Sequence, residues 1–211
     1  MYKKLFLALL CGIVLSLSFP PFKLGFLAYF GLIPLFVLLN NENYKGAIKW
    51  GYLTGLFFNI VTLYWINWVT IPGSIAAILY LPVYFILFAI FYTFLRQRLG
   101  MNYLFLSIPF LWTGIEYIRS LGVLGFPWTS LAYSQSYYLS LIQYASFTSV
   151  YGVSFWIVCI NVVIMAIFYK YRKLTQAIAL YLFLILLFIV PWLYGKLVIP
   201  RPDNKGHEKI R

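Results

Sequence analysis

Acidic residues are almost missing from this chain of 211 residues, which has four of them against 16 lysines and arginines. Charged residues of both signs amount to 9% of the sequence, whereas soluble globular domains contain about 25%. Hydrophobic residues make up 64% and aromatic residues 22%. This composition excludes an ordinary soluble domain and indicates a protein embedded in a membrane.

Histidine and cysteine are also scarce. The lone histidine, His207, lies near the C-terminus, and the two cysteines, Cys11 and Cys159, lie far apart within apolar runs. Such a set forms neither a disulfide framework nor a metal site with the usual ligand spacing. Two-histidine haem ligation from this chain alone is excluded, and there is no glycine-rich phosphate loop. We therefore expect no metal and no cofactor.

Long uncharged stretches are what the chain does contain. Residues 5–22, 24–41, 50–95, 99–115, 120–169 and 174–195 have no Lys, Arg, Asp or Glu. A membrane-spanning helix needs about 20 mostly apolar residues, whereas a membrane barrel alternates in segments of about ten. The sequence predicts an all-α membrane protein, a polytopic bundle of about seven transmembrane helices. The expected spans are 5–19, 25–39, 50–68, 76–95, 103–118, 146–168 and 175–194.

The distribution of basic residues predicts the topology. The net charge of +12 is spread in small clusters between apolar runs, so it indicates helix orientation and not nucleic-acid binding. With Lys3 and Lys4 in the cytoplasm, seven spans leave nine basic residues inside and only Lys23 and Arg119 outside before the tail. An eighth span would place the basic cluster at 170–173 on the outer side, against the usual excess of Lys and Arg in cytoplasmic loops. We expect a cytoplasmic N-terminus and an extracytoplasmic C-terminus.

This topology divides the chain into two parts. Residues 1–195 form the predicted transmembrane domain, in which 119–145 is an outward-facing interfacial loop rich in aromatic residues. Residues 196–211 form a basic tail, which we interpret as the start of a linker. Pro34 and Pro82 lie inside predicted spans and should kink them, since proline lacks a donor N–H.

Glu116 and Arg119 are the candidate functional pair, placed at the end of an otherwise uncharged run. Three residues apart, they share one helix face, and charged side chains at membrane depth are costly. Two interpretations stay open. The pair orients a lipid headgroup or a loop near the outer surface, or it is a structural ion pair that fixes the fifth helix. Arg119 also has the planar guanidinium that suits a lipid phosphate.

Three short motifs accompany this pair. Gly125–Trp128 is a predicted turn with two large apolar rings, which is either an interfacial anchor or a lip over a lipid groove. Tyr133–Gln135 adds polar groups just beyond that turn. Asn67 and Trp68 end the third span, where the amide can hydrogen-bond to a neighbouring helix.

The spacing of these residues resembles that of the bacterial apolipoprotein N-acyltransferases. Residues 111–135 match the pattern of that family without a gap. The matching residues are Leu111, Trp112, Glu116, Arg119, Gly125, Phe126, Pro127, Trp128, Tyr133, Ser134 and Gln135. Phe19-Pro20, Asn67-Trp68 and Tyr151–Phe155 are similar as well, so the resemblance covers essentially the whole chain.

The resemblance implies a multi-pass protein of the bacterial inner membrane. Members of the family transfer an acyl chain from a phospholipid to the N-terminal cysteine amine of a lipoprotein. Their reactive cysteine, glutamate and lysine belong to a nitrilase-like αββα domain that follows the seventh helix, where this sequence stops at Arg211. No catalytic role therefore carries over to any residue here.

We accordingly expect the membrane half of a truncated or split acyltransferase, inactive alone. Its expected partners are membrane phospholipid and either a lipoprotein substrate or a separate nitrilase-like chain. The alternatives are a small membrane transporter and a non-enzymatic lipid-binding subunit. A transporter would need polar groups along a path at mid-membrane, and the candidates, which are Asn59, Thr62, Asn67 and Asn161, are few and lie close to the ends of the spans.

Overall fold

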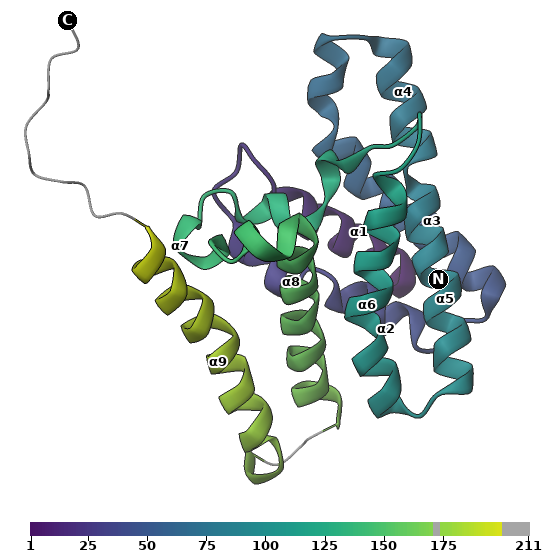
Figure 1. Cartoon of the computed structure of the whole chain (residues 1–211). Helices are drawn as coiled ribbons and strands as arrows, with labels where there is room; N and C mark the ends of the chain where they lie inside the picture. The colour runs from purple at the N-terminus through teal and green to yellow at the C-terminus, as the bar shows by residue number, and fades with distance from the viewer. Residues whose placement is uncertain (171–173, 200–211) are drawn as a thin grey trace, which may run out of the picture.

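The uncharged stretches fold into helices because backbone groups in lipid must satisfy one another internally. The computed structural model describes residues 1–170 and 174–199, and every regular element in these residues is helical (Figure 1). The longer helices are α1 (Tyr2–Leu17), α3 (Tyr44–Thr62), α4 (Ile71–Tyr80), α5 (Pro82–Arg98), α6 (Met101–Arg119), α8 (Ala145–Lys170) and α9 (Leu174–Val198). The predicted all-α class is thereby confirmed.

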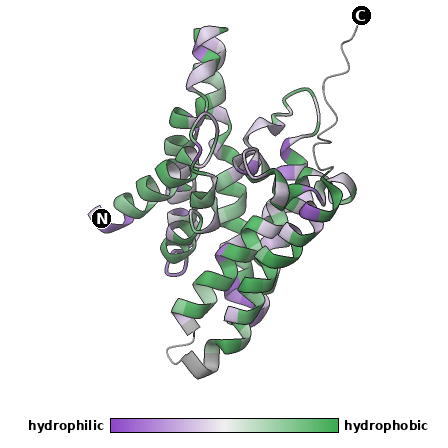
Figure 2. Cartoon of the chain, turned by 90° about the vertical axis from the view of Figure 1, so that its left-hand side faces the viewer, coloured by the Kyte–Doolittle hydropathy of each residue, from purple (hydrophilic) through white to green (hydrophobic). Residues whose placement is uncertain are grey.

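Three helical segments of the described residues are long and apolar enough to cross a membrane. They are Ile71–Arg98, which combines α4 and α5, Ala145–Tyr169 and Ala177–Val198. Of the other helices, α1 has 16 residues, and α3 and α6 have 19 residues and carry two charged side chains each. Figure 2 shows that hydrophobic residues predominate along the long helices, as expected of a membrane protein.

The predicted span 25–39 is broken in the structure. Gly25–Tyr29 forms a 3-10 helix, η1, and the α-helix α2 begins only at Ile33 and ends at Leu39. Pro34, expected to kink this span, lies in the first turn of α2, where its missing N–H costs nothing. The predicted continuous span is thus interrupted, because residues 30–32 between the two helices are in turns.

The other predicted spans differ from the structure mainly at their ends. The third begins earlier, at Tyr44, where the Asn43 side chain accepts a hydrogen bond from the Gly46 N–H at 2.9 Å. It ends at Thr62 and is followed by the 3-10 helix η2, Tyr64–Trp68. Pro82 is the first residue of α5, and one residue, Leu81, separates it from the end of α4, so the expected interruption does lie at this proline.

The segment 119–145 contains only short helices. These are the 3-10 helices η3 (Pro127–Thr129) and η4 (Leu131–Gln135) and the single turn α7 (Leu139–Ile142). Within α8, Ser149 has a φ of 62° and interrupts the helix near its start. That this segment faces outward stays a prediction. The predicted linker 196–211 lies outside the described residues beyond position 199.

Glycines allow a close contact between α3 and α5 in the core. Gly51 and Gly55 lie four residues apart on α3 and face α5. A Cβ at either position would lie 2.8 Å from the α5 backbone, at Phe85 O or Pro82 Cα. Such small residues let two helices approach closely in a membrane protein, where packing and not water exclusion drives association.

Charged residues bring the predicted inner ends of several helices together. Lys4 Nζ lies 2.5 Å from Glu42 Oε1, and the Arg96 guanidinium donates to the backbone carbonyls of Asn40 and Glu42. Elsewhere, Lys23 of the first predicted outer turn lies over the ring of Tyr137. The grouping agrees with the predicted topology, whereas the side of the membrane that each end faces stays a prediction.

Candidate functional site

The last two turns of α6 place three candidate residues on one face. Trp112, Glu116 and Arg119 follow one another at helical intervals of four and three residues, so their side chains project the same way. All three are buried, and the side chains of Glu116 and Arg119 are 2% and 6% exposed. The charged pair therefore lies within the protein and not at its lipid-facing surface.

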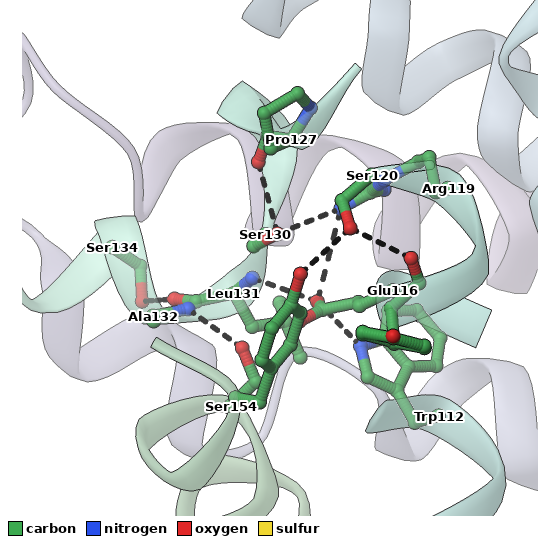
Figure 3. Close-up of polar contacts among 12 residues, drawn as sticks. Trp112, Glu116, Arg119, Ser120, Pro127, Ser130, Leu131, Ala132, Ser134 and Ser154 are labelled. Atoms are coloured by element: carbon green, nitrogen blue, oxygen red, sulfur yellow. Dashed lines mark hydrogen bonds and ion pairs between the residues drawn. The ribbon is translucent and has the colours of Figure 1, made fainter. Parts of the chain in front are cut away.

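The Glu116 carboxylate connects α6 to η4 (Figure 3). Its Oε1 accepts hydrogen bonds from Trp112 Nε1 and from the backbone N–H of Leu131, both at 2.8 Å. Arg119 Nη2 lies 4.0 Å from the same oxygen, at the outer limit of an ion pair. The short contacts are thus with neutral donors, and one of them fixes a loop that lies 15 residues further along the chain.

Arg119 binds the preceding part of that loop. Its Nη2 donates to Ser130 Oγ at 3.2 Å, and the Ser130 hydroxyl donates to Pro127 O at 2.9 Å. The Arg119 carbonyl accepts the Phe126 N–H at 2.8 Å. The guanidinium carbon also lies 6.0 Å from the centre of the Tyr84 ring on α5, a cation–π contact. With these contacts and its burial, the guanidinium is not placed to bind a lipid phosphate.

Gln135 and Ser134 attach the other end of η4 to η1. Gln135 Nε2 donates to Gly25 O at 2.9 Å and to Ser134 Oγ at 2.8 Å, and Tyr29 OH donates to Gln135 Oε1 at 2.6 Å. Both side chains are fully buried. These contacts satisfy backbone and amide groups that would be costly to leave unpaired in an apolar interior.

The start of α8 closes the same region. Ser154 Oγ accepts the Ala132 N–H at 3.1 Å (Figure 3). Ser120 Oγ and Tyr151 OH lie 2.7 Å apart, just after α6 ends. The segment Pro127–Gln135 is therefore bound by α6, α8 and η1 together, and we name it the motif loop.

The rings of Trp128 and Tyr133 are the exposed part of the motif loop, and Trp128 is 60% exposed. The ring of Phe126, just before the loop, meets that of Trp128 edge to face with centroids 5.1 Å apart. A cavity of about 200 Å³ lies between Trp128, Tyr133 and Trp65 of η2. A second cavity, of about 310 Å³, lies between α4 and the Val123–Phe126 segment that includes Gly125. The buried polar side chains thus fix the motif loop so that its exposed rings lie beside these cavities.

Asn67 and Trp68 are not part of this network. Both are exposed, and Trp68 contacts Tyr64 edge to face at 5.6 Å between centroids. The element that carries them, η2, reaches the motif loop through Trp65 instead. The residue of η2 that lines the cavity is therefore a different one from the two that the sequence pattern marked, whose role stays a prediction.

Several contacting residues escaped the sequence analysis. Ser130, Tyr84 and Tyr29 bind the candidate residues, but a lone serine or tyrosine in an aromatic-rich chain gives no signal by itself. Ser154 and Tyr151 lie in a matched motif that suggested packing. Among residues 1–170 and 174–199, no group of three His, Cys, Asp or Glu side chains could hold a metal ion.

Comparison with known proteins identifies the family. The model described as "Apolipoprotein N-acyltransferase N-terminal domain" matches residues 11–163. An apolipoprotein N-acyltransferase of Geobacter metallireducens is 37% identical over 76% of this chain and 33% of its own length. Relatives with the same name from Rickettsia prowazekii and Chlorobaculum tepidum are 30% and 28% identical over 100% and 98% of this chain.

The chain spans less than half the length of these relatives, 44% of the Rickettsia protein and 43% of the Chlorobaculum protein. The family model covers the motif loop and the helices that bind it, α6 and the first part of α8. The resemblance read from residues 111–135 is thereby confirmed: the chain belongs to the family of the apolipoprotein N-acyltransferase N-terminal domain.

Proposed function

We propose that this chain is the membrane part of an apolipoprotein N-acyltransferase in the bacterial inner membrane. In this proposal it holds the motif loop at the outer membrane surface, where a phospholipid acyl donor and a lipoprotein acceptor meet. A nitrilase-like domain, in the same or in a separate chain, supplies the reactive cysteine. Family membership, together with helices long and apolar enough to cross a membrane, supports this assignment.

The observation that carries the proposal is the bond between Glu116 and the Leu131 N–H. It joins the buried end of α6 to the motif loop, which bears the exposed rings of Trp128 and Tyr133. We infer that Trp112, Glu116 and Arg119 are positioning residues, because each contacts protein groups and none is open to a substrate. The exposed rings are the part that can contact a lipid chain.

A hybrid protein tests the proposal. Residues 1–195 of this chain would replace the corresponding part of the Geobacter metallireducens relative, in cells depleted of their own N-acyltransferase. Mass spectrometry of an N-terminal lipopeptide would measure N-acylation. We expect the hybrid to acylate. Trp128→Ala should lower the rate about fivefold, because the contact between its exposed ring and the lipid chain, worth about 1 kcal/mol, is lost.

Phe168→Ala is the matched control, because Phe168 is also an exposed aromatic residue, 81% exposed, at the far end of α8. It should leave acylation unchanged. A membrane-inserted hybrid without activity, beside an active parent enzyme, would contradict the proposal. Acylation by the 211-residue chain alone with Cys11→Ala and Cys159→Ala would contradict it too, since the reactive groups would then lie in this chain.

A further inference from the structure

A cavity of about 550 Å³ lies between α7 and the end of α9, away from the buried Glu116 carboxylate. Tyr137, Tyr138 and Ser140 line it from the α7 side, and Phe188, Ile189 and Trp192 line it from α9. Figure 1 places both elements at one edge of the molecule, where α9 stands outside α8. We name it the edge pocket.

The walls of the edge pocket are fixed by close contacts. A Cβ at Gly195 would lie 1.9 Å from Ser140 O, so the backbones of α7 and α9 touch at this point. Trp156 Nε1 of α8 donates to Leu187 O at 2.6 Å and binds α9 in the middle. The rings of Phe147 and Tyr194 meet edge to face, 5.8 Å apart. The pocket is therefore a built feature of the fold.

Two lysines approach the aromatic lining. Lys23 Nζ lies 5.8 Å from the centre of the Tyr137 ring, and Lys196 Nζ lies 5.8 Å from the centre of the Trp192 ring. Within the described ranges, the ion pairs are Lys4 with Glu42 and Arg119 with Glu116, so no acidic side chain of those residues pairs with either lysine. The edge pocket thus combines positive charge with an apolar wall.

The surface next to the pocket is apolar. Only 6% of the apolar stretch of α9 is buried within the protein, and Ile185, Ile189 and Trp192 are about half exposed. A ligand that fits needs an anionic group for the lysines and a long apolar part for the α9 wall. A small soluble anion would leave that wall unused, and an acidic peptide would place polar backbone groups against it.

We propose that the edge pocket binds a glycerophospholipid. The phosphate lies between the Lys23 and Lys196 ammonium groups, the Tyr137 and Ser140 hydroxyls donate to the headgroup, and an acyl chain follows Phe188 and Ile189. Lysines near a membrane surface attract anionic lipid, and aromatic rings at headgroup level stabilise the glycerol region. This site is separate from the motif loop and does not require acyl transfer.

Native mass spectrometry of the detergent-purified protein, titrated with phosphatidylglycerol, tests the site. We expect the double variant Lys23→Gln/Lys196→Gln to bind the lipid roughly thirtyfold more weakly, since each of the two lysines near a membrane surface contributes about 1 kcal/mol. Lys23→Arg/Lys196→Arg should retain binding, because it keeps both charges. Lys45→Gln/Lys49→Gln is the matched control, since Lys49 also lies over an aromatic ring, Trp50, at 4.9 Å.

Equal losses in the test and control pairs would overturn the proposal, because they would reflect net charge alone. Displacement of the lipid by millimolar inorganic phosphate would overturn the lipid assignment in favour of a free-phosphate site. A phosphatidylglycerol with a photoreactive acyl chain gives a second measurement. It should label the peptide that contains Phe188 and Ile189 in the wild type and label it weakly in the Gln variant, and unchanged labelling would contradict the proposal.

Discussion

The helices α8 and α9 are almost equally apolar, but they are packed in opposite ways. In the apolar stretch of α8, 67% of the residues are buried within the protein, against 6% in that of α9. Polar residues account for much of the difference: Asn161 and Ser154 of α8 are fully buried and bind other elements, whereas the middle of α9 is Leu, Ile and Phe. In this protein, buried polar contacts and close packing decide which apolar helix is central.

Asn161 shows how such a contact works. Its Nδ2 donates to Ala28 O at 2.7 Å, and its Oδ1 accepts the Leu32 N–H at 3.0 Å. These two backbone groups flank the break between η1 and α2, where no helix satisfies them. A break at membrane depth is tolerated only where protein groups replace the lost helical bonds. The same side chain, Asn161, therefore binds the buried helix α8 to its neighbours and satisfies the backbone groups at the break in 25–39.

The largest effect should come from Glu116→Ala, on the polar side of this comparison. It removes the acceptor of Trp112 Nε1 and the Leu131 N–H and leaves the Arg119 guanidinium buried without its carboxylate. We expect unfolding in mixed micelles to become easier by about 3–5 kcal/mol. Glu116→Gln keeps an acceptor oxygen and should lose less. Near-equal stability of the Ala variant and wild type would show that the carboxylate does not hold the motif loop.

The second-largest loss of stability should come from Asn161→Leu. The leucine removes both contacts at the break and leaves two buried backbone groups unpaired, a cost of about 2–4 kcal/mol. The same unfolding measurement applies. Gln143→Leu is the matched control, because Gln143 makes one hydrogen bond, to Leu139 O, in an exposed position. If the two amide variants lose the same stability, the comparison between α8 and α9 fails.

The smallest loss of stability is expected for a substitution in α9. The same change, isoleucine to alanine, is made in α8 and in α9 for comparison. Ile157 of α8 is fully buried and Ile185 of α9 is 51% exposed. Ile157→Ala should cost about 2 kcal/mol through lost packing, and Ile185→Ala less than about 0.5 kcal/mol, because lipid chains contact it as well as protein does. A large loss at Ile185 would mean that α9 is covered by another protein surface.

The sequence predicted well the helices that coincide with long uncharged runs. The limits of α6 and α9 lie within a few residues of the predicted spans 103–118 and 175–194, since charge and length alone decide such helices. The break within 25–39 was missed because a glycine and a proline, here Gly31 and Pro34, are compatible with a kinked helix as well as with a full break. Only the position of Asn161, 129 residues away from Leu32, distinguishes them.

The candidate site was predicted only in part. The spacing of Glu116 and Arg119 placed them on one helix face, and the resemblance marked the motif loop. Which atoms they bind could not be predicted, because the Leu131 N–H and Ser130 hydroxyl reach them through the path of the chain. Their 4.0 Å separation also makes the ion pair a minor contact, contrary to the simplest interpretation of a charged pair.

The bond from Glu116 to residue 131 joins a side chain to a main-chain amide. Every amino acid except proline carries that N–H, so the attachment depends on the course of the backbone and is indifferent to the chemical type of residue 131. Any residue other than proline at position 131 can therefore keep this attachment, as long as the backbone follows the same path.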